Sequence, residues 1–592
     1  MLADSFDIRH SIFVILFMNL SPEKKIAGIL APLFGLRSEN DLGIGDVAVL
    51  REFIDWAAQI GFKLVQLLPI NEMGHDNSPY NAISAMAIEP TTLHLAPGSP
   101  EDLTRDDYEA ALADADLRKL RHGAVKYGAV KKVKRRLLEK AFVNFSAHPS
   151  EDRSASGEAT AGSQSKFRDF CRQESAWLDD YAFFRALMEE NAESEAWDKW
   201  PAEHQHIKSA RAWLDRQSPQ KTKQFHDREN FFRYIQWIAN EQWCAIKSYA
   251  EEHGVALMGD IPFGVNYCSA DVFSRRDEFA LDWCGGAPPE SHFKDDKFTQ
   301  KWGQNWGIPL FHWDAMRHRK FDWWRQRVRS IRRSFHLFRI DHVLGFYRIY
   351  AFPWRPQQNR KFLPLEWNQM LERTGGRAPH FHPRDDSSTN NCEANRHQGE
   401  ECLRAVLEES GDARVIGEDL GTVPDYVRPS LRSLGVAGFK IPQWEFYHGR
   451  VTPGAEYERL SVATYATHDH KPTRALWEEA FEHATSTSDQ ARGELEKIAT
   501  FTGFTRTSDQ IDFERDFYPA MMEALFKSES WIAVVMITDL LARKYRFNIP
   551  GTAASSNWVR RMQRSVAQLR SSPKERKRMQ LIRELLEKSG RI

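Results

Sequence analysis

Three carboxylates in this 592-residue chain stand at the ends of short apolar runs, where they could carry out acid–base chemistry. Asp341 ends the run LFRI, Glu418 follows RVIG, and Asp469 comes after SVATYATH. A short apolar run that ends in polar residues is typical of a buried strand whose tip reaches solvent. Cleavage of a glycosidic bond with retention needs two such carboxyl groups about 5–5.5 Å apart, one ionised and one protonated. Glycoside chemistry is therefore one candidate activity.

Asp341 has a neighbour that favours the ionised form. Arg339 is two residues away, so on a strand both side chains point to the same face. A guanidinium beside a carboxylate stabilises its charge, and an ionised, positioned aspartate can serve as a nucleophile. The alternative interpretation is a structural Arg–Asp pair at a strand end, and the dipeptide spacing alone leaves both open.

Eight apolar runs are expected to be the strands that position these groups. Helical patterns or longer insertions separate them, which predicts an α/β fold, a (β/α)8 TIM barrel with its chemistry at the strand tips. A helix N-capped by Asp46 is expected to follow the first strand and run to about Ile60. The predicted strands are 26–32, 62–70, 255–265, the run that ends at Asp341, the run that ends at Glu418, 438–444, 461–470 and 531–541.

Residues from about 96 to 230 interrupt the strand–helix alternation with charged, helix-prone sequence, and we expect a large helical insertion there. Its basic run KKVKRR, Lys131 to Arg136, is interpreted as a solvated helix face in preference to a nucleic-acid site. Long loops are expected at 149–165, at 285–309 and at 379–396. The predicted domains are thus an N-terminal extension, 1–25, and a catalytic barrel, 26–592, that contains the insertion.

Composition excludes several classes of function. The net charge of -1 provides no general attraction to nucleic acid or to an anionic membrane. The apolar run 12–18 is shorter than the ~20 residues of a membrane span, and its flanks do not resemble a secretory signal; Met18 could be the true start. Six scattered cysteines without a CxxC pair indicate neither a zinc site nor a redox motif, and they fit a reducing cytoplasm.

Several motifs together resemble one family. FRIDHVLGFYRI, GEDLG and THDH occur in that order, accompanied by SPY, GQNWG and an RFNIPGT…NW ending. The set is similar to the 4-alpha-glucanotransferases of glycoside hydrolase family 77, over roughly residues 26 to 565. The chain departs from the family pattern at PPESHF, where PPDYF is usual, and at Thr538, where glutamine is usual. No β-rich stretch follows the eighth predicted strand, which separates the chain from alpha-amylases with a C-terminal β-sandwich.

The resemblance implies roles for specific residues. Asp341 would be the nucleophile, Glu418 the general acid and base, and Asp469 a transition-state stabiliser acting with His468. Further residues are expected to contact or support the substrate: Tyr80, Asp260, Gln304, Asn305, Trp306, Arg339 and His342.

The expected substrates are α-1,4-glucans, with glucose as one acceptor, and neither a metal nor an organic cofactor is implied. A nucleic-acid or membrane partner is not expected, and the chain is predicted to be a monomer or a weak homo-oligomer. Two alternatives stay open: an alpha-glucan hydrolase or branching enzyme of the same clan, and a non-enzymatic glucan-binding scaffold.

Overall fold

Eight short parallel strands form the centre of the computed structural model, which describes residues 20–147, 162–290, 296–482, 488–504, 511–550 and 555–592. The run 12–18, most of the tract 149–165 and the last three residues of PPESHF lie outside the described residues. The strands follow the order β10-β13-β14-β1-β2-β3-β6-β9. They are β1 (Ile26–Leu30), β2 (Leu64–Gln66), β3 (Ala256–Ile261), β6 (Leu337–Ile340), β9 (Arg414–Gly417), β10 (Gly438–Lys440), β13 (Ser461–Ala463) and β14 (Ile532–Met536).

A single parallel bridge closes this sheet into a barrel. Ile416 at the end of β9 pairs with Ala437 just before β10, and the amide of Gly417 donates to the Ala437 carbonyl at 2.9 Å. The predicted (β/α)8 barrel is therefore confirmed. All eight strand tips then lie at the same end of the barrel, which is where barrel enzymes carry their active sites.

Helix α1 (Val47–Ile60) forms where its capping residues predict it. The Asp46 carboxylate accepts from the amides of Ala48 and Val49, which have no partner inside the helix. Gly61 ends the helix with φ of 109°, a conformation that a side chain would strain. The Asp46 N-cap was therefore predicted correctly. The apolar face of α1 is buried against the barrel.

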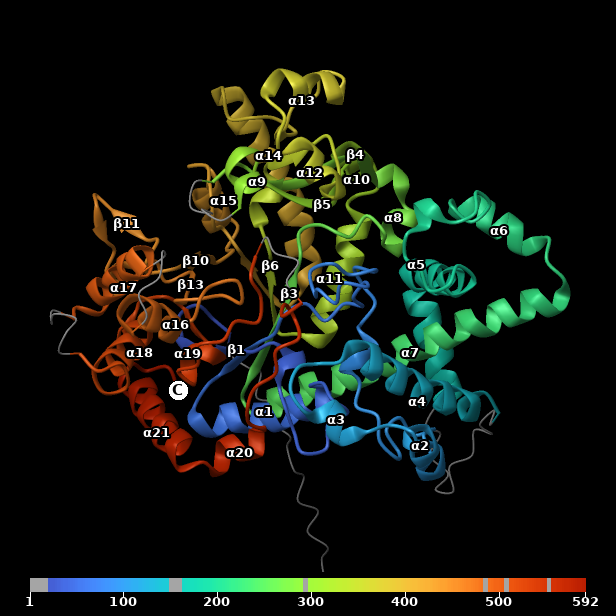
Figure 1. The fold of residues 1–592 in the computed structure, drawn as a ribbon, viewed down its shortest axis with the longest axis horizontal. Coiled ribbons are helices and arrows are strands. Elements are labelled where there is room, and N and C mark those ends of the chain that lie inside the picture. The colour runs from blue at the N-terminus through green and yellow to red at the C-terminus, as the bar shows by residue number, and fades with distance from the viewer. Residues whose placement is uncertain (1–19, 148–161, 291–295, 483–487, 505–510, 551–554) are drawn as a thin grey trace, which may run out of the picture.

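A helical block lies between β2 and β3 and forms the right-hand side of Figure 1. Its aromatic side chains, including Phe145, Tyr234 and Trp237, pack on one another and belong to the same hydrophobic core as the barrel. Its principal helices are α2 (Arg105–Leu112), α3 (Leu117–Arg121), α4 (Tyr127–Ala147), α5 (Ser163–Glu190), α6 (Ile207–Asp215) and α7 (Pro219–Glu252).

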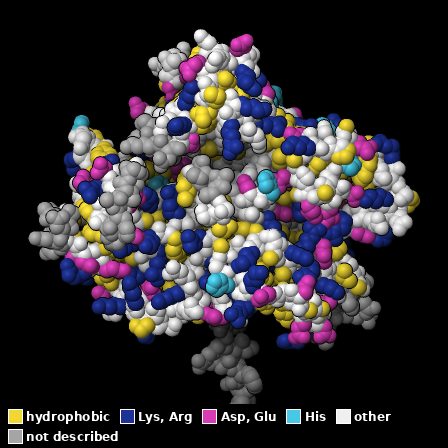
Figure 2. Space-filling view, in the orientation of Figure 1, with side chains coloured by type: hydrophobic (Ala, Val, Ile, Leu, Met, Phe, Trp, Pro, Cys, Tyr) yellow, Lys and Arg dark blue, Asp and Glu magenta, His cyan; other side chains and the backbone are white. Residues whose placement is uncertain are grey.

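The basic run on α4 is not a solvated face along its whole length, which corrects the expectation. Lys134 is 1% exposed, ion-paired with Asp46 at 3.5 Å, and donates to the carbonyls of Thr91 and Leu93 at 2.7 and 2.6 Å. A helix turns its residues to all sides, so Val133 and Lys134 of this six-residue run face inward. Figure 2 shows basic and acidic side chains interspersed over the visible face, without a continuous basic stripe.

A second sheet stands beside the barrel tips, and it includes strands in the stretches 285–309 and 379–396, where the sequence predicted loops. It is antiparallel, with the order β5-β4-β7-β8, and contains β4 (Phe279–Ala287), β5 (Gln304–Phe311), β7 (Ile349–Phe352) and β8 (His380–His382). GQNWG therefore leads into a strand, and the predicted loop 379–396 contains β8 and the start of α14 (Thr389–Ser410). The signal was weak because β4 contains an aspartate and two glycines, and β5 an asparagine, a glycine and a proline, all of which are depleted in strands. At Gly286 the glycine is needed, since a Cβ atom would lie 1.8 Å from the Gln304 carbonyl oxygen.

After β14 the described residues form helices, α19 (Ile537–Leu540), α20 (Val566–Ser571) and α21 (Pro573–Lys588), and no strand. This agrees with the predicted lack of a C-terminal β-sandwich. Within the described residues no helix combines the length and the apolar character that crossing a membrane requires.

Candidate active site

Arg339 is the buried centre of the candidate site. It lies on β6 beside Asp260 of β3 in the parallel register, and its Nη1 donates to Asp260 Oδ2 at 2.6 Å. Its Nη2 donates to Asp341 Oδ1 at 2.5 Å. Arg339 and Asp260 are almost fully buried, whereas the Asp341 side chain is 30% exposed. The Arg–Asp pair expected from the sequence is therefore formed, and it leaves Asp341 open to a ligand.

Glu418 is brought beside Asp341 by strand pairing. The Glu418 amide donates to the Ile340 carbonyl at 2.9 Å, which continues the β6–β9 register by one residue. The His342 amide donates in turn to Glu418 Oε2 at 2.8 Å. His342 has φ of 48°, the left-handed conformation that a residue with a side chain adopts only when its surroundings hold it there. The backbone turn directly after Asp341 thus holds the side chain of Glu418 from the adjacent strand.

The electrostatics of this pair differ in the direction that acid catalysis needs. Burial raises the pKa of Glu418 to about 8, and the negative charge of Asp341 adds to the rise, while Arg339 opposes it. Glu418 is therefore protonated at neutral pH. Burial also lowers the pKa of His342 to about 4, so this imidazole is neutral and adds no charge to the site.

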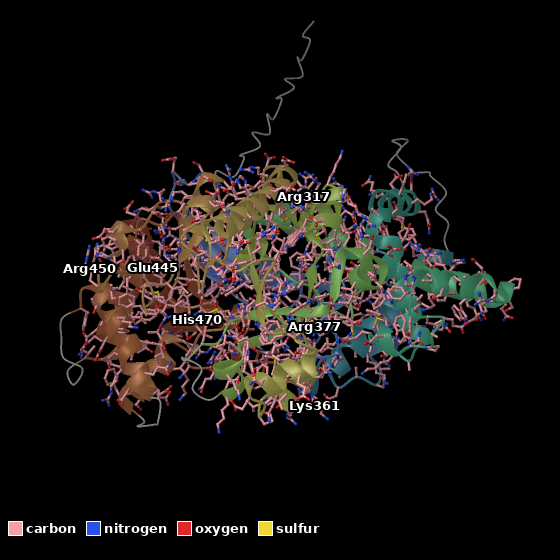
Figure 3. All side chains as sticks on the ribbon, turned by 90° about the horizontal axis from the view of Figure 1, so that it is seen from above. Arg317, Lys361, Arg377, Glu445, Arg450 and His470 are labelled. Carbon is pink, nitrogen blue, oxygen red and sulfur yellow. The ribbon has the colours of Figure 1, made fainter. Side chains whose placement is uncertain are left out.

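Asp469 and His468 follow β13, which is two strands along the barrel from β9, the strand before Glu418. His468 Nε2 is 3.2 Å from Asp469 Oδ2, and Asn548 Nδ2 donates to Asp469 Oδ1 at 2.6 Å. Burial alone would raise the pKa of Asp469, but His468 and Asn548 outweigh it and hold the pKa below its ordinary range. Asp469 is thus an ionised hydrogen-bond acceptor. The next residue, His470, lies closer to the centre of the molecule than Glu445 and Arg450 do (Figure 3).

Tyr80 connects the two halves of the site. Its hydroxyl donates to Asp260 Oδ2 at 2.6 Å and lies 3.4 Å from His468 Nδ1. The Tyr80 ring stacks on the His468 ring with centroids 4.8 Å apart. One chain of contacts therefore runs from Asp469 through His468, Tyr80, Asp260 and Arg339 to Asp341.

Of the three residues of GQNWG that were assigned to substrate, Trp306 is exposed, Gln304 is bonded to it, and Asn305 is bonded to other parts of the protein. Trp306 is 39% exposed, its ring stands edge-on to His342 at 4.8 Å, and its Nε1 donates to Gln304 Oε1 at 3.1 Å. Asn305 instead donates to the Trp354 carbonyl at 2.8 Å and accepts from the Gly307 amide at 3.1 Å. Its amide group is thus used within the protein.

Two residues of the site were not assigned from the sequence, although their motif was noticed. Asn548 and Trp558 both come from the RFNIPGT…NW ending. The Trp558 ring lies 5.8 Å from both the Tyr80 and the His468 rings. Their position after the last barrel strand could have indicated them, because the end of that strand lies at the same end of the barrel as the site. No group of His, Cys, Asp and Glu suited to a metal ion occurs in the part of the chain that the structure describes.

Comparisons with known proteins agree with this geometry. A family model described as 4-alpha-glucanotransferase, glycoside hydrolase family 77, matches residues 31–567. A 4-alpha-glucanotransferase of Chlamydia caviae is 30% identical over 562 residues, which cover 92% of this chain and 91% of the relative. A 4-alpha-glucanotransferase of Aquifex aeolicus is 26% identical and covers 92% of this chain and 96% of its own. These matches span nearly the whole of both chains.

Two solved structures share the fold. An amylomaltase from Streptococcus agalactiae in complex with acarbose has a TM-score of 0.69 at 21% identity, covering 96% of this chain and 100% of its own. An amylomaltase from Corynebacterium glutamicum has a TM-score of 0.73 at 20% identity, covering 96% of this chain and 76% of its own.

A parallel barrel with paired carboxylates at its strand tips defines a glycoside-processing enzyme. This chain belongs to glycoside hydrolase family 77, the 4-alpha-glucanotransferases.

Proposed function

We propose that this enzyme transfers α-1,4-glucan segments between maltooligosaccharides, or to glucose, by retaining double displacement. The observation that carries the mechanism is that the backbone of His342 holds the buried Glu418 beside Asp341, which Arg339 holds in place. Burial raises the pKa of Glu418 to about 8, which favours its protonated form at neutral pH. One carboxyl group is set up as an acid and the other as a nucleophile, as retention requires.

In the first half-reaction Asp341 attacks the anomeric carbon of the donor glucan. The bond between that carbon and the glycosidic oxygen breaks, and the proton of Glu418 passes to the leaving oxygen. The products are a glycosyl ester on Asp341, an ionised Glu418 and the released reducing-end fragment.

In the second half-reaction the 4-hydroxyl of an acceptor glucan takes the place of the leaving fragment. Glu418 removes its proton as the oxygen attacks the anomeric carbon, and the ester bond to Asp341 breaks. The new α-1,4 bond retains the original configuration because two inversions have occurred, and both carboxyl groups return to their starting states.

Asp469, His468 and Tyr80 would hold the sugar during both steps. Asp469 is an ionised acceptor for sugar hydroxyls, and hydrogen bonds to such hydroxyls strengthen as the ring flattens toward an oxocarbenium ion. Asp260 supports Arg339 and Tyr80, and its second oxygen has no partner among the described groups.

We also propose that the helical insertion belongs to one catalytic unit with the barrel, because the two share a hydrophobic core. Six free cysteines support a cytoplasmic location. We further propose that the enzyme is a monomer or a weak homo-oligomer.

Incubation with maltotriose followed by chromatography tests the proposal. Transfer produces glucose together with oligomers longer than maltotriose, whereas hydrolysis produces only shorter sugars. A product mixture without longer oligomers would contradict transfer, and binding without turnover would indicate a scaffold.

A further inference from the structure

The segment that carries Tyr80 is not held by the barrel alone. Residues 71–88, between β2 and the insertion, fold back on themselves with antiparallel bridges between Asn71 and Ile88 and between Met73 and Ala82. Glu72 joins the two arms: its amide donates to the Ala87 carbonyl at 2.9 Å, and its carbonyl accepts from the Ile83 amide at 2.8 Å. A displacement of Glu72 would therefore move both arms.

The Glu72 side chain is bound entirely by helices of the insertion. Its Oε1 is 3.2 Å from Nε of Arg185, and its Oε2 accepts a short hydrogen bond from the hydroxyl of Tyr181, both on α5. The ion pair is buried, with both side chains 9% exposed, so it is little screened by solvent. A buried pair with few geometric alternatives holds its partners in register.

The insertion also holds the far arm and the tip of this segment. The side chain of Gln236 on α7 accepts from the Ile88 amide at 2.8 Å and donates to the Ile88 carbonyl at 3.0 Å. Glu195 accepts from the His75 amide at 3.1 Å. Contacts from α5, from α7 and from the connection between them thus hold residues 71–88 in place. Tyr80 lies within this segment and contacts Asp260 and His468.

We propose that Glu72, Arg185 and Tyr181 form a positioning cluster, through which the helical insertion sets the location of Tyr80 in the active site. The proposal rests on the proposed function, since it assigns the cluster to the glucan site. Glu72 acts through Tyr80 and does not touch substrate. The insertion then contributes to turnover without supplying a catalytic group.

A double-mutant cycle between Glu72 and Tyr80 tests the proposal, with kcat/KM for maltotriose as the readout. We expect Glu72→Gln to lower kcat/KM about tenfold in the wild-type background, because Arg185 loses its buried partner, keeps only the more exposed Glu193, and the segment shifts. In a Tyr80→Phe background, where the hydroxyl contact with Asp260 is already absent, Glu72→Gln should lower it less than twofold. Equal effects in the two backgrounds would overturn the proposal.

Two further variants separate positioning from stability. Tyr181→Phe removes one hydroxyl and keeps the ring packed, so it should fold and lower kcat/KM about threefold; no change would contradict the role of the cluster. Lys134→Met is the matched control, since it breaks another buried ion pair between insertion and barrel that is not bonded to residues 71–88. It should lower the melting temperature and leave kcat/KM unchanged. A fall in kcat/KM equal to that of Glu72→Gln would show a general stability effect.

The cycle is measured by total consumption of maltotriose, so it does not depend on the proportion of transfer. If the wild-type enzyme only hydrolysed maltotriose, the transfer proposal would fail while the coupling between Glu72 and Tyr80 would still be measured.

Discussion

The backbone amide of His342 donates a hydrogen bond of 2.8 Å to Oε2 of Glu418, so the residue next to Asp341 holds the opposing carboxyl group. The left-handed turn at His342 aims this amide across the strand tips. The relative position of the two carboxyl groups therefore depends on main-chain geometry, which varies less than a contact between two long side chains.

Asp341→Asn tests the nucleophile. We expect turnover of maltotriose to fall by about 10⁴-fold or more, with an unchanged melting profile, because an amide cannot form the glycosyl ester. Mass spectrometry after incubation with a slow fluorinated glycosyl donor should show an adduct on the wild type alone. Asp282→Asn, at an exposed carboxylate of β4, is the control and should retain full activity. An adduct that still formed on the Asn variant would rule out Asp341.

The pH dependence of kcat/KM tests the protonation state of Glu418. The pKa of about 8 lies above the ordinary value, so the acid is protonated below pH 8 and loses its proton above it. Activity should therefore be retained through neutral pH and fall tenfold per pH unit well above 8. A profile measured on maltotriose that began to fall near pH 6, or stayed flat to pH 10, would contradict the assignment.

Glu418→Gln separates the two half-reactions. General acid catalysis contributes about 10²–10⁴-fold, so cleavage of maltotriose should slow by this factor. A glucosyl fluoride donor needs no proton on its leaving group, so the variant should still form the glycosyl ester on Asp341 and accumulate it. The ester would be detected by intact-protein mass spectrometry. Equal slowing with both donors would show that Glu418 does not act as the acid.

Trp306→Ala tests the competition between an acceptor sugar and water. Trp306 is exposed beside His342 and can stack on an acceptor ring, and positioning a reactant contributes up to about 7–11 kcal/mol to lowering a barrier. The variant should lose transfer more than hydrolysis, so the ratio of released glucose to long oligomers rises. If both activities fell by one factor while the sheet stayed folded, Trp306 would belong to donor binding or to the structure of β5.

Lys134→Met tests the buried contact between insertion and barrel. Removing one partner of a buried ion pair costs up to about 3–5 kcal/mol, because the buried Asp46 loses its nearest cation and keeps only His94 and the amides of α1. Chemical denaturation should report a loss of that size. Lys132→Met, two residues away on the exposed face, is the control and should stay within about 0.5 kcal/mol of the wild type. Equal stability of both variants would contradict the role of the Lys134 pair.

The strands and the three carboxylates at their tips could be predicted from the sequence because each signal is local. The apolar run before Asp341 or Glu418 predicts a buried strand whatever the rest of the chain contains. Eight such runs separated by helical patterns then predict a barrel. The resemblance of RIDH, GEDLG and THDH then supplied the roles, which the spacing of Arg339 and Asp341 left open.

Other features were decided only by the tertiary structure, since they depend on segments far apart in the sequence. Strand β5 exists because β4 pairs with it, and its asparagine, glycine and proline are all residues that strands disfavour. Lys134 can be buried because Asp46, 88 residues away, forms an ion pair with it and two backbone carbonyls accept its hydrogen bonds. The contact of Asn305 also depends on a distant segment, since its side-chain amide donates to the Trp354 carbonyl. Pairing partners and burial are properties of the folded chain, and burial is what raises the pKa of Glu418.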